Sequence, residues 1–125
     1  MQQFDMYING EAVKSGSTFE VINPATGKSF AQVQQGSVAH VNQAVSAARA
    51  AFPAWSKTSD EERKKLCHAL ADALEENMLE FMTLVTKETG KPMNGLNGVG
   101  SGMEVGGSMG WARYTADLQL PVDII

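Results

Sequence analysis

The sequence has only one cysteine and two histidines among 125 residues, so it is poor in the side chains that act as nucleophiles, bases or soft metal ligands. The single Cys67 cannot form an internal disulfide, which agrees with a reducing compartment. No apolar run approaches the roughly 18 residues that a membrane-spanning helix needs, and residues 1–5 carry no basic leader. We therefore predict a cytoplasmic protein without a membrane segment.

A concentration of positive charge is also absent. The chain has ten Lys and Arg residues against fourteen Asp and Glu residues, a net charge of -4, and the positive charges are scattered. Nucleic acids and anionic membranes attract proteins through clustered basic residues. We therefore expect neither as a partner.

Two glycine motifs resemble nucleotide-binding loops, but each lacks a required residue. Residues 98–103, Gly-Val-Gly-Ser-Gly-Met, place Met103 where a dinucleotide fingerprint needs its third glycine. Around Gly90-Lys91, Val85 occupies the first glycine position of a phosphate loop, and Pro92 replaces the hydroxyl that would hold magnesium. Neither motif predicts a cofactor site.

The reactive side chains form no catalytic or metal-binding pattern. Cys67 and His68 are neighbours on a predicted helix, so their side chains diverge by about 100° and cannot pair as nucleophile and base. His40 and His68 have no nearby ligand spacing, and the acidic residues 60–62 mark a helix start. We predict no catalytic, cofactor-binding or metal-binding residue in this chain.

The first third of the chain predicts two β-hairpins. Asn9-Gly10 lies between short strand-like pieces, and both residues tolerate the positive φ of a type I′ turn. Residues 18–22 and 28–33 alternate in polarity around residues 23–27, Asn-Pro-Ala-Thr-Gly, whose composition favours a reversal.

Helical spacing predicts a first helix over residues 38–52, capped by Ser37 and ended by Pro53. We expect Trp55 to pack between this helix and the next. The narrow apolar stripe and the many alanines of the helix over residues 38–52 require a close neighbour.

The strongest period in the chain predicts a helix over residues 60–88. Ser59 and Glu62 form a capping box, and Gly90 followed by Pro92 ends the helix. Asn77 could divide it, so one helix and two collinear helices both remain open. One face is apolar throughout, with Leu66, Leu70, Ala73, Leu74, Met78, Phe81, Met82 and Val85.

A third helix is predicted over residues 94–116, although glycine recurs there. Gly98, Gly102, Gly106 and Gly110 are four residues apart, which places them on one helical face suited to close contact with another backbone. Each interior glycine costs about 0.5–1 kcal/mol relative to alanine, so this helix needs tertiary packing. Residues 118–125 are expected to begin an extended strand.

Taken in order, several segments resemble the N-terminal part of the NAD(P)-dependent aldehyde dehydrogenases. The matching segments span essentially the whole chain and are residues 7–11, 21–27, 44–55, 62–63 and 88–92. The resemblance implies the N-terminal part of an α/β, Rossmann-type fold; as a fragment the chain is α+β, with two hairpins followed by three helices. It implies that residues 1–117 belong to the cofactor-binding domain and that residues 118–125 begin the bridging strand used in oligomerisation.

The resemblance implies a parent enzyme that oxidises aldehydes to acids through a cysteine thiohemiacetal, with hydride transfer to NAD or NADP. The catalytic cysteine, the general-base glutamate and the cofactor loops of the family have no counterpart here, and Cys67 matches none of them. We therefore expect a scaffold fragment that is inactive alone, whose partner is the rest of a homo-oligomeric enzyme. The alternative is a free-standing helical interaction module.

Overall fold

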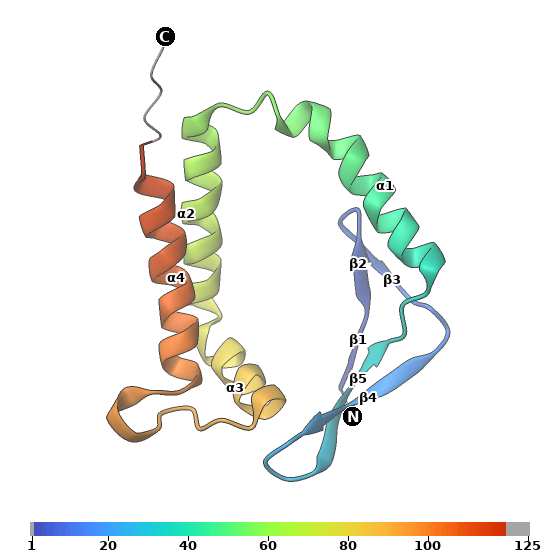
Figure 1. Cartoon of the computed structure of the whole chain (residues 1–125), viewed down its shortest axis with the longest axis vertical. Helices are drawn as coiled ribbons and strands as arrows, with labels where there is room; N and C mark the ends of the chain where they lie inside the picture. Colours follow the sequence, from blue (N-terminus) through green and yellow to red (C-terminus); the bar gives the residue numbers. More distant parts are fainter. Residues whose placement is uncertain (1, 120–125) are drawn as a thin grey trace. The chain divides into compact units, whose positions relative to one another are not determined.

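The computed structural model describes residues 2–119, which divide into two compact units. The first comprises residues 2–58 with Lys87–Gly90, and the second comprises residues 59–86 and 91–119. Figure 1 shows the elements of each unit in sequence colours. The observed order of strands followed by helices confirms the predicted α+β fragment.

The first unit contains both predicted hairpins and one strand that the sequence did not predict. β2 (Met6–Ile8) pairs antiparallel with β3 (Glu11–Val13), and β4 (Thr18–Asn23) pairs antiparallel with β5 (Lys28–Gln34). The additional strand, β1 (Gln2–Phe4), runs parallel to β5 and completes a three-stranded sheet. Three residues show too little alternation to identify such a strand from sequence.

Both hairpin turns form as their residues predict. Asn9 and Gly10 have φ values of 56° and 78°, the left-handed conformation that a type I′ turn requires. In the second turn, the Oδ1 atom of Asn23 accepts a hydrogen bond of 2.9 Å from the amide of Ala25, and Gly27 has φ 67°.

Helix α1 (Val38–Trp55) is longer than predicted, because Pro53 does not end it. Pro53 lies in the last turn, where its missing N–H removes a single helical bond. The amide of Ser56 still reaches the carbonyl of Phe52 at 2.8 Å and closes the helix. At the start, the amide of His40 donates to the Ser37 hydroxyl, and the amide of Ser37 donates to the Nδ1 atom of His40.

The long predicted helix is divided at Asn77 into α2 (Asp60–Glu76) and α3 (Met78–Thr89). The backbone of Asn77 leaves helical geometry at φ -107° and ψ 17°. Figure 1 shows the axis changing direction there, so the two helices are not collinear. Ser59 accepts from the amide of Glu62 at 3.2 Å, which confirms the Ser59 half of the predicted capping box; the return bond from the Ser59 amide to the Glu62 carboxylate is absent among the described residues.

The glycine-rich helix α4 (Ser101–Asp117) begins seven residues later than the predicted start at residue 94. The preceding loop contains a short 3-10 turn, η1 (Leu96–Gly98), with Asn97 and Gly98 in left-handed conformation at φ 61° and 76°. A helix cannot pass through two such residues. The loop is nevertheless fixed, because the amides of Ser101 and Gly102 donate to the carbonyls of Pro92 and Met93.

In the second unit, α4 lies antiparallel beside α2, as Figure 1 shows. The side chains buried in this unit are Ala71, Ser101, Val105, Met109 and Ala116. The hydroxyl groups of Ser101 and Thr86 are 2.5 Å apart, which ties the start of α4 to α3. The core is therefore a small helix–helix seam, built from small and medium-sized side chains.

The predicted strand over residues 118–125 lies largely outside the described residues. Leu118 is the C-cap of α4 and is extended, with φ -64° and ψ 140°. Residues 120–125 are among those not described.

Candidate docking surface

The face of α2 that α4 covers is its polar face. Ala71 is fully buried there, and Arg113 of α4 donates to the carboxylates of Asp72 at 2.8 Å and Glu75 at 2.5 Å. The hydrogen bond to Asp72, followed by that to Glu75, raises the pKa of Arg113 above its ordinary value. Charge-assisted contacts of this kind fix the register of two helices more than they add stability.

A second polar contact joins the same two helices. The Nε2 atom of His68 lies 2.9 Å from the Oδ1 atom of Asp117, the last residue of α4. Asp72, Glu75 and His68 recur at spacings of three and four residues, so they share one helical face. That spacing was visible in the sequence, but nothing there indicated that Arg113 or Asp117 would face it.

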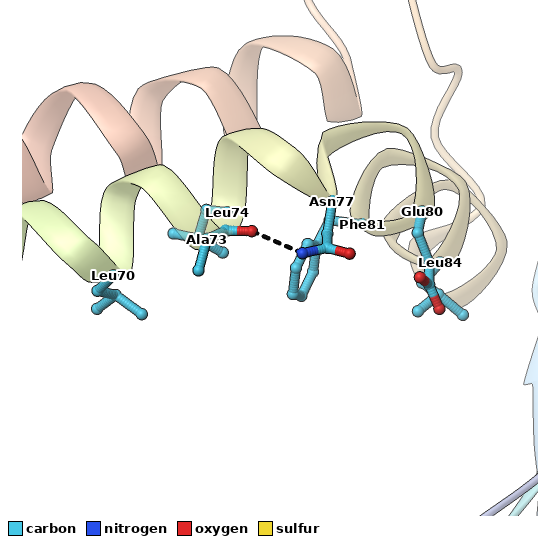
Figure 2. Close-up of a pocket in the computed structure, with 7 residues that line it drawn as sticks. All are labelled: Leu70, Ala73, Leu74, Asn77, Glu80, Phe81 and Leu84. Atoms are coloured by element: carbon cyan, nitrogen blue, oxygen red, sulfur yellow. Dashed lines mark hydrogen bonds between the residues drawn. The ribbon is translucent and has the colours of Figure 1, made fainter.

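Part of the apolar face of the α2–α3 segment is left exposed among the described residues, whereas Leu74, Met78 and Met82 on the same face are half-buried. Leu66 and Leu70 are 51% and 58% exposed, and Phe81 is 40% exposed. In Figure 2 the Leu70 and Phe81 side chains lie on the side of the segment away from the α4 ribbon. The predicted apolar stripe is therefore present, and the part of it that contains Leu66, Leu70 and Phe81 is an outer surface of this unit.

A hollow of about 310 Å³ lies where α2 turns into α3. We call it the elbow hollow; its lining residues are Leu70, Ala73, Leu74, Asn77, Glu80, Phe81 and Leu84. Its lining is mostly apolar, and its two polar residues are Asn77 and Glu80. It contains no pair of groups that could act as nucleophile and base.

Asn77 shapes the elbow hollow through its side chain and its backbone. Its Nδ2 atom donates to the carbonyl of Ala73 at 2.8 Å, and its own carbonyl accepts from the amide of Phe81 at 3.1 Å. The Asn77 side chain therefore bonds back to α2, and its backbone carbonyl accepts the first helical bond of α3. The break brings Leu70 of α2 and Phe81 of α3 around the same hollow.

Each unit exposes further apolar residues. In the first unit α1 buries no residue, and Val38, Val41 and Phe52 are 78%, 60% and 64% exposed. Trp55 is 48% exposed, and its packing between α1 and α2 stays a prediction. In the second unit Trp111 and Tyr114 meet edge to face with ring centres 5.8 Å apart, yet both remain exposed. Exposed apolar surface on this scale is typical of a protein that docks against another polypeptide.

The predicted glycine face of α4 is only partly in contact. A Cβ atom on Gly102 would lie 3.0 Å from the Met82 side chain and 2.9 Å from the Asn94 side chain, whereas Gly106 and Gly110 have no neighbour within 4 Å. Gly98 lies outside the helix, which corrects that part of the prediction. Whether Gly106 and Gly110 approach another backbone stays a prediction.

The remaining reactive residues have local structural partners or ordinary surroundings. Cys67 is a free, partly buried thiol, and His40 serves the cap of α1. Among residues 2–119, no three His, Cys, Asp or Glu side chains gather as a metal site. No helix in this part of the chain is long and apolar enough to cross a membrane.

Both units combine secondary structure with exposed apolar side chains. Comparison with known proteins gives the family: the model of the aldehyde dehydrogenase family matches residues 12–120. The chain belongs to the aldehyde dehydrogenase family, as the sequence motifs predicted.

The chain is similar to two curated relatives over most of its own length. It is 37% identical over 94 residues to the 5-carboxymethyl-2-hydroxymuconate semialdehyde dehydrogenase of Escherichia coli, covering 75% of the chain and 20% of the relative. It is 40% identical over 118 residues to the mitochondrial aldehyde dehydrogenase of Leishmania tarentolae, covering 93% of the chain and 23% of the relative.

Solved structures agree with this assignment. The NAD-dependent aldehyde dehydrogenase of Sinorhizobium meliloti superimposes with a TM-score of 0.83 at 29% identity, over 92% of this chain and 23% of that one. The chain thus spans about a fifth of the length of the relatives that it matches. The match to part of larger enzymes does not favour the alternative of a free-standing interaction module.

Proposed function

We propose that this chain is the N-terminal scaffold of an NAD- or NADP-dependent aldehyde dehydrogenase and is inactive alone. The observation that carries the proposal is the uncovered apolar face of α2 and α3, in a chain that spans about a fifth of its relatives. The rest of the enzyme would cover this face and bury Leu70 and Phe81. Removing that apolar area from water would contribute about 25 cal/mol per Å².

The chemistry would belong to the whole enzyme. Oxidation of an aldehyde to an acid needs a thiolate, a base and a bound nicotinamide held in one constellation. The predictions that this chain holds no catalytic, cofactor-binding or metal-binding residue are part of the proposal. So are the assignment of residues 1–117 to the cofactor-binding domain and the beginning of the bridging strand in residues 118–125.

We also make a proposal about the location, oligomeric state and partners of the enzyme. We infer a cytoplasmic homo-oligomer that binds neither nucleic acid nor membrane. The acidic net charge of -4 and the single cysteine support this inference.

The test compares the isolated chain with the full-length enzyme that contains it. The full-length enzyme should form NADH or NADPH from aliphatic or aromatic aldehydes, and the isolated chain should form none. In the full-length enzyme, Leu70→Asp should lower the yield of folded, active protein far more than Leu96→Asp, since Leu96 is 93% exposed in a loop. Equal effects of the two substitutions would show that the proposed face is not covered.

A further inference from the structure

The elbow hollow contains two oxygen acceptors within an apolar surface. The Nδ2 atom of Asn77 is committed to the carbonyl of Ala73, which leaves its Oδ1 atom as an acceptor. The carboxylate of Glu80 forms no ion pair with any residue in the described part of the chain. Figure 2 shows Asn77 beside Phe81 in the middle of the hollow and Glu80 beside Leu84 at its α3 end.

No cation on the same helix can reach Glu80 at the usual spacing. The residues three and four positions away on either side are Glu76, Asn77, Thr83 and Leu84. A polypeptide that covers the hollow would lie against the Glu80 carboxylate, which has no partner from its own helix and loses contact with water wherever that polypeptide covers it. An unpaired charge in such a place costs several kcal/mol, which would oppose docking.

We propose that the elbow hollow receives an apolar segment that carries one lysine or arginine, whose cationic group pairs with Glu80. The segment belongs to the part of the aldehyde dehydrogenase fold that lies outside these 125 residues, so the inference rests on the proposed function. The apolar side chains of the segment pack against Leu70, Leu74 and Phe81. The Oδ1 atom of Asn77 offers a second acceptor to the same cationic group.

Charge decides against a second copy of this chain as the occupant. A two-fold contact between copies uses the same patch on both sides, so it would bring one Glu80 towards another. The chain as a whole is also acidic, with a net charge of -4. Like charges that face each other across an interface are unfavourable.

The experiment uses the full-length enzyme and substitutes Glu80 by glutamine. Glutamine keeps the size and the acceptor oxygen but removes the charge, so it leaves a buried cation without its partner. The matched control is Glu62→Gln, because Glu62 is the third residue of α2, as Glu80 is of α3, and loses the same interaction with a helix N-terminus. We expect Glu80→Gln to raise the unfolding rate about tenfold or more over Glu62→Gln, and Glu80→Lys to raise it further.

The outcomes separate this inference from the proposed function. If Leu70→Asp fails to destabilise the full-length enzyme relative to Leu96→Asp, the hollow is not covered, and the proposed function fails with the inference. If Leu70→Asp is destabilising but Glu80→Gln behaves like Glu62→Gln, the hollow is covered without a cation, and only the inference is overturned. A full-length enzyme whose oligomer is strengthened by Glu80→Lys and dissociated by Leu70→Asp would assign the hollow to a second copy and also overturn it.

Discussion

Gly90 offers a sharp test of how the first unit is held together. It follows α3 with φ 73°, as the predicted helix stop requires, and it belongs to the short segment Lys87–Gly90 that packs with this unit. A Cβ atom on Gly90 would lie 2.8 Å from Cγ of Pro24 and 3.1 Å from the amide nitrogen of Ala25. The glycine therefore allows the chain to approach the turn after β4.

The cost of Gly90→Ala has two parts. The first part is conformational. Holding alanine in the left-handed conformation destabilises the folded unit by about 1–2 kcal/mol, whereas the reduced freedom of the unfolded chain stabilises it by about 0.4–1 kcal/mol. The overlap with the Pro24 ring and the adjacent backbone adds about 1–3 kcal/mol, as in an overpacked core. We expect the substitution to lower the free energy of unfolding of the first unit by about 2–4 kcal/mol.

Gly27→Ala is the matched control. Gly27 lies in the same unit with φ 67°, but a Cβ atom there has no neighbour within 4 Å. Gly27→Ala should therefore lower the free energy of unfolding only by the conformational part, about 1 kcal/mol. Urea unfolding of both variants, followed by circular dichroism and by hydrogen exchange of the β4 and β5 amides, measures the difference. Equal losses for the two variants would refute the close approach of Gly90 to Pro24.

Three further predictions concern the second unit. Ala71→Leu should lower the free energy of unfolding of the second unit, measured in urea, by about 1–3 kcal/mol, because Ala71 is 0% exposed beneath α4. An unchanged midpoint of urea unfolding would show that the seam between α2 and α4 has unfilled space. Leu70→Asp should reduce binding of a hydrophobic dye and self-association of the isolated chain, measured by fluorescence and light scattering, whereas Leu96→Asp should change both less. Amides of α4 should exchange with solvent before those of α2, because Gly102, Gly106, Gly107 and Gly110 each weaken the helix by about 0.5–1 kcal/mol.

The features that the sequence predicted well are those set by local chemistry. The Asn9-Gly10 turn and the Ser59 cap depend on residues close together in the chain, so their patterns were sufficient. The predicted end of α1 and the predicted start of α4 were wrong, because two sequence signals at each place favour different conformations. Pro53 is tolerated because only the last turn of α1 follows it, and residues 94–100 form a loop because Asn97 and Gly98 adopt left-handed conformations.

The face of α2 that packs inside this chain could not be predicted from the apolar pattern. A hydrophobic stripe normally indicates the face that a neighbouring element covers, yet α4 covers the opposite side through Ala71, Arg113 and the carboxylates of Asp72 and Glu75. The two faces differ in what they provide: the charged face fixes the register of α4, and the apolar face offers most of the burial. The part of the apolar face that contains Leu66, Leu70 and Phe81 therefore stays exposed in this unit, and our proposal assigns its partner to the rest of the enzyme.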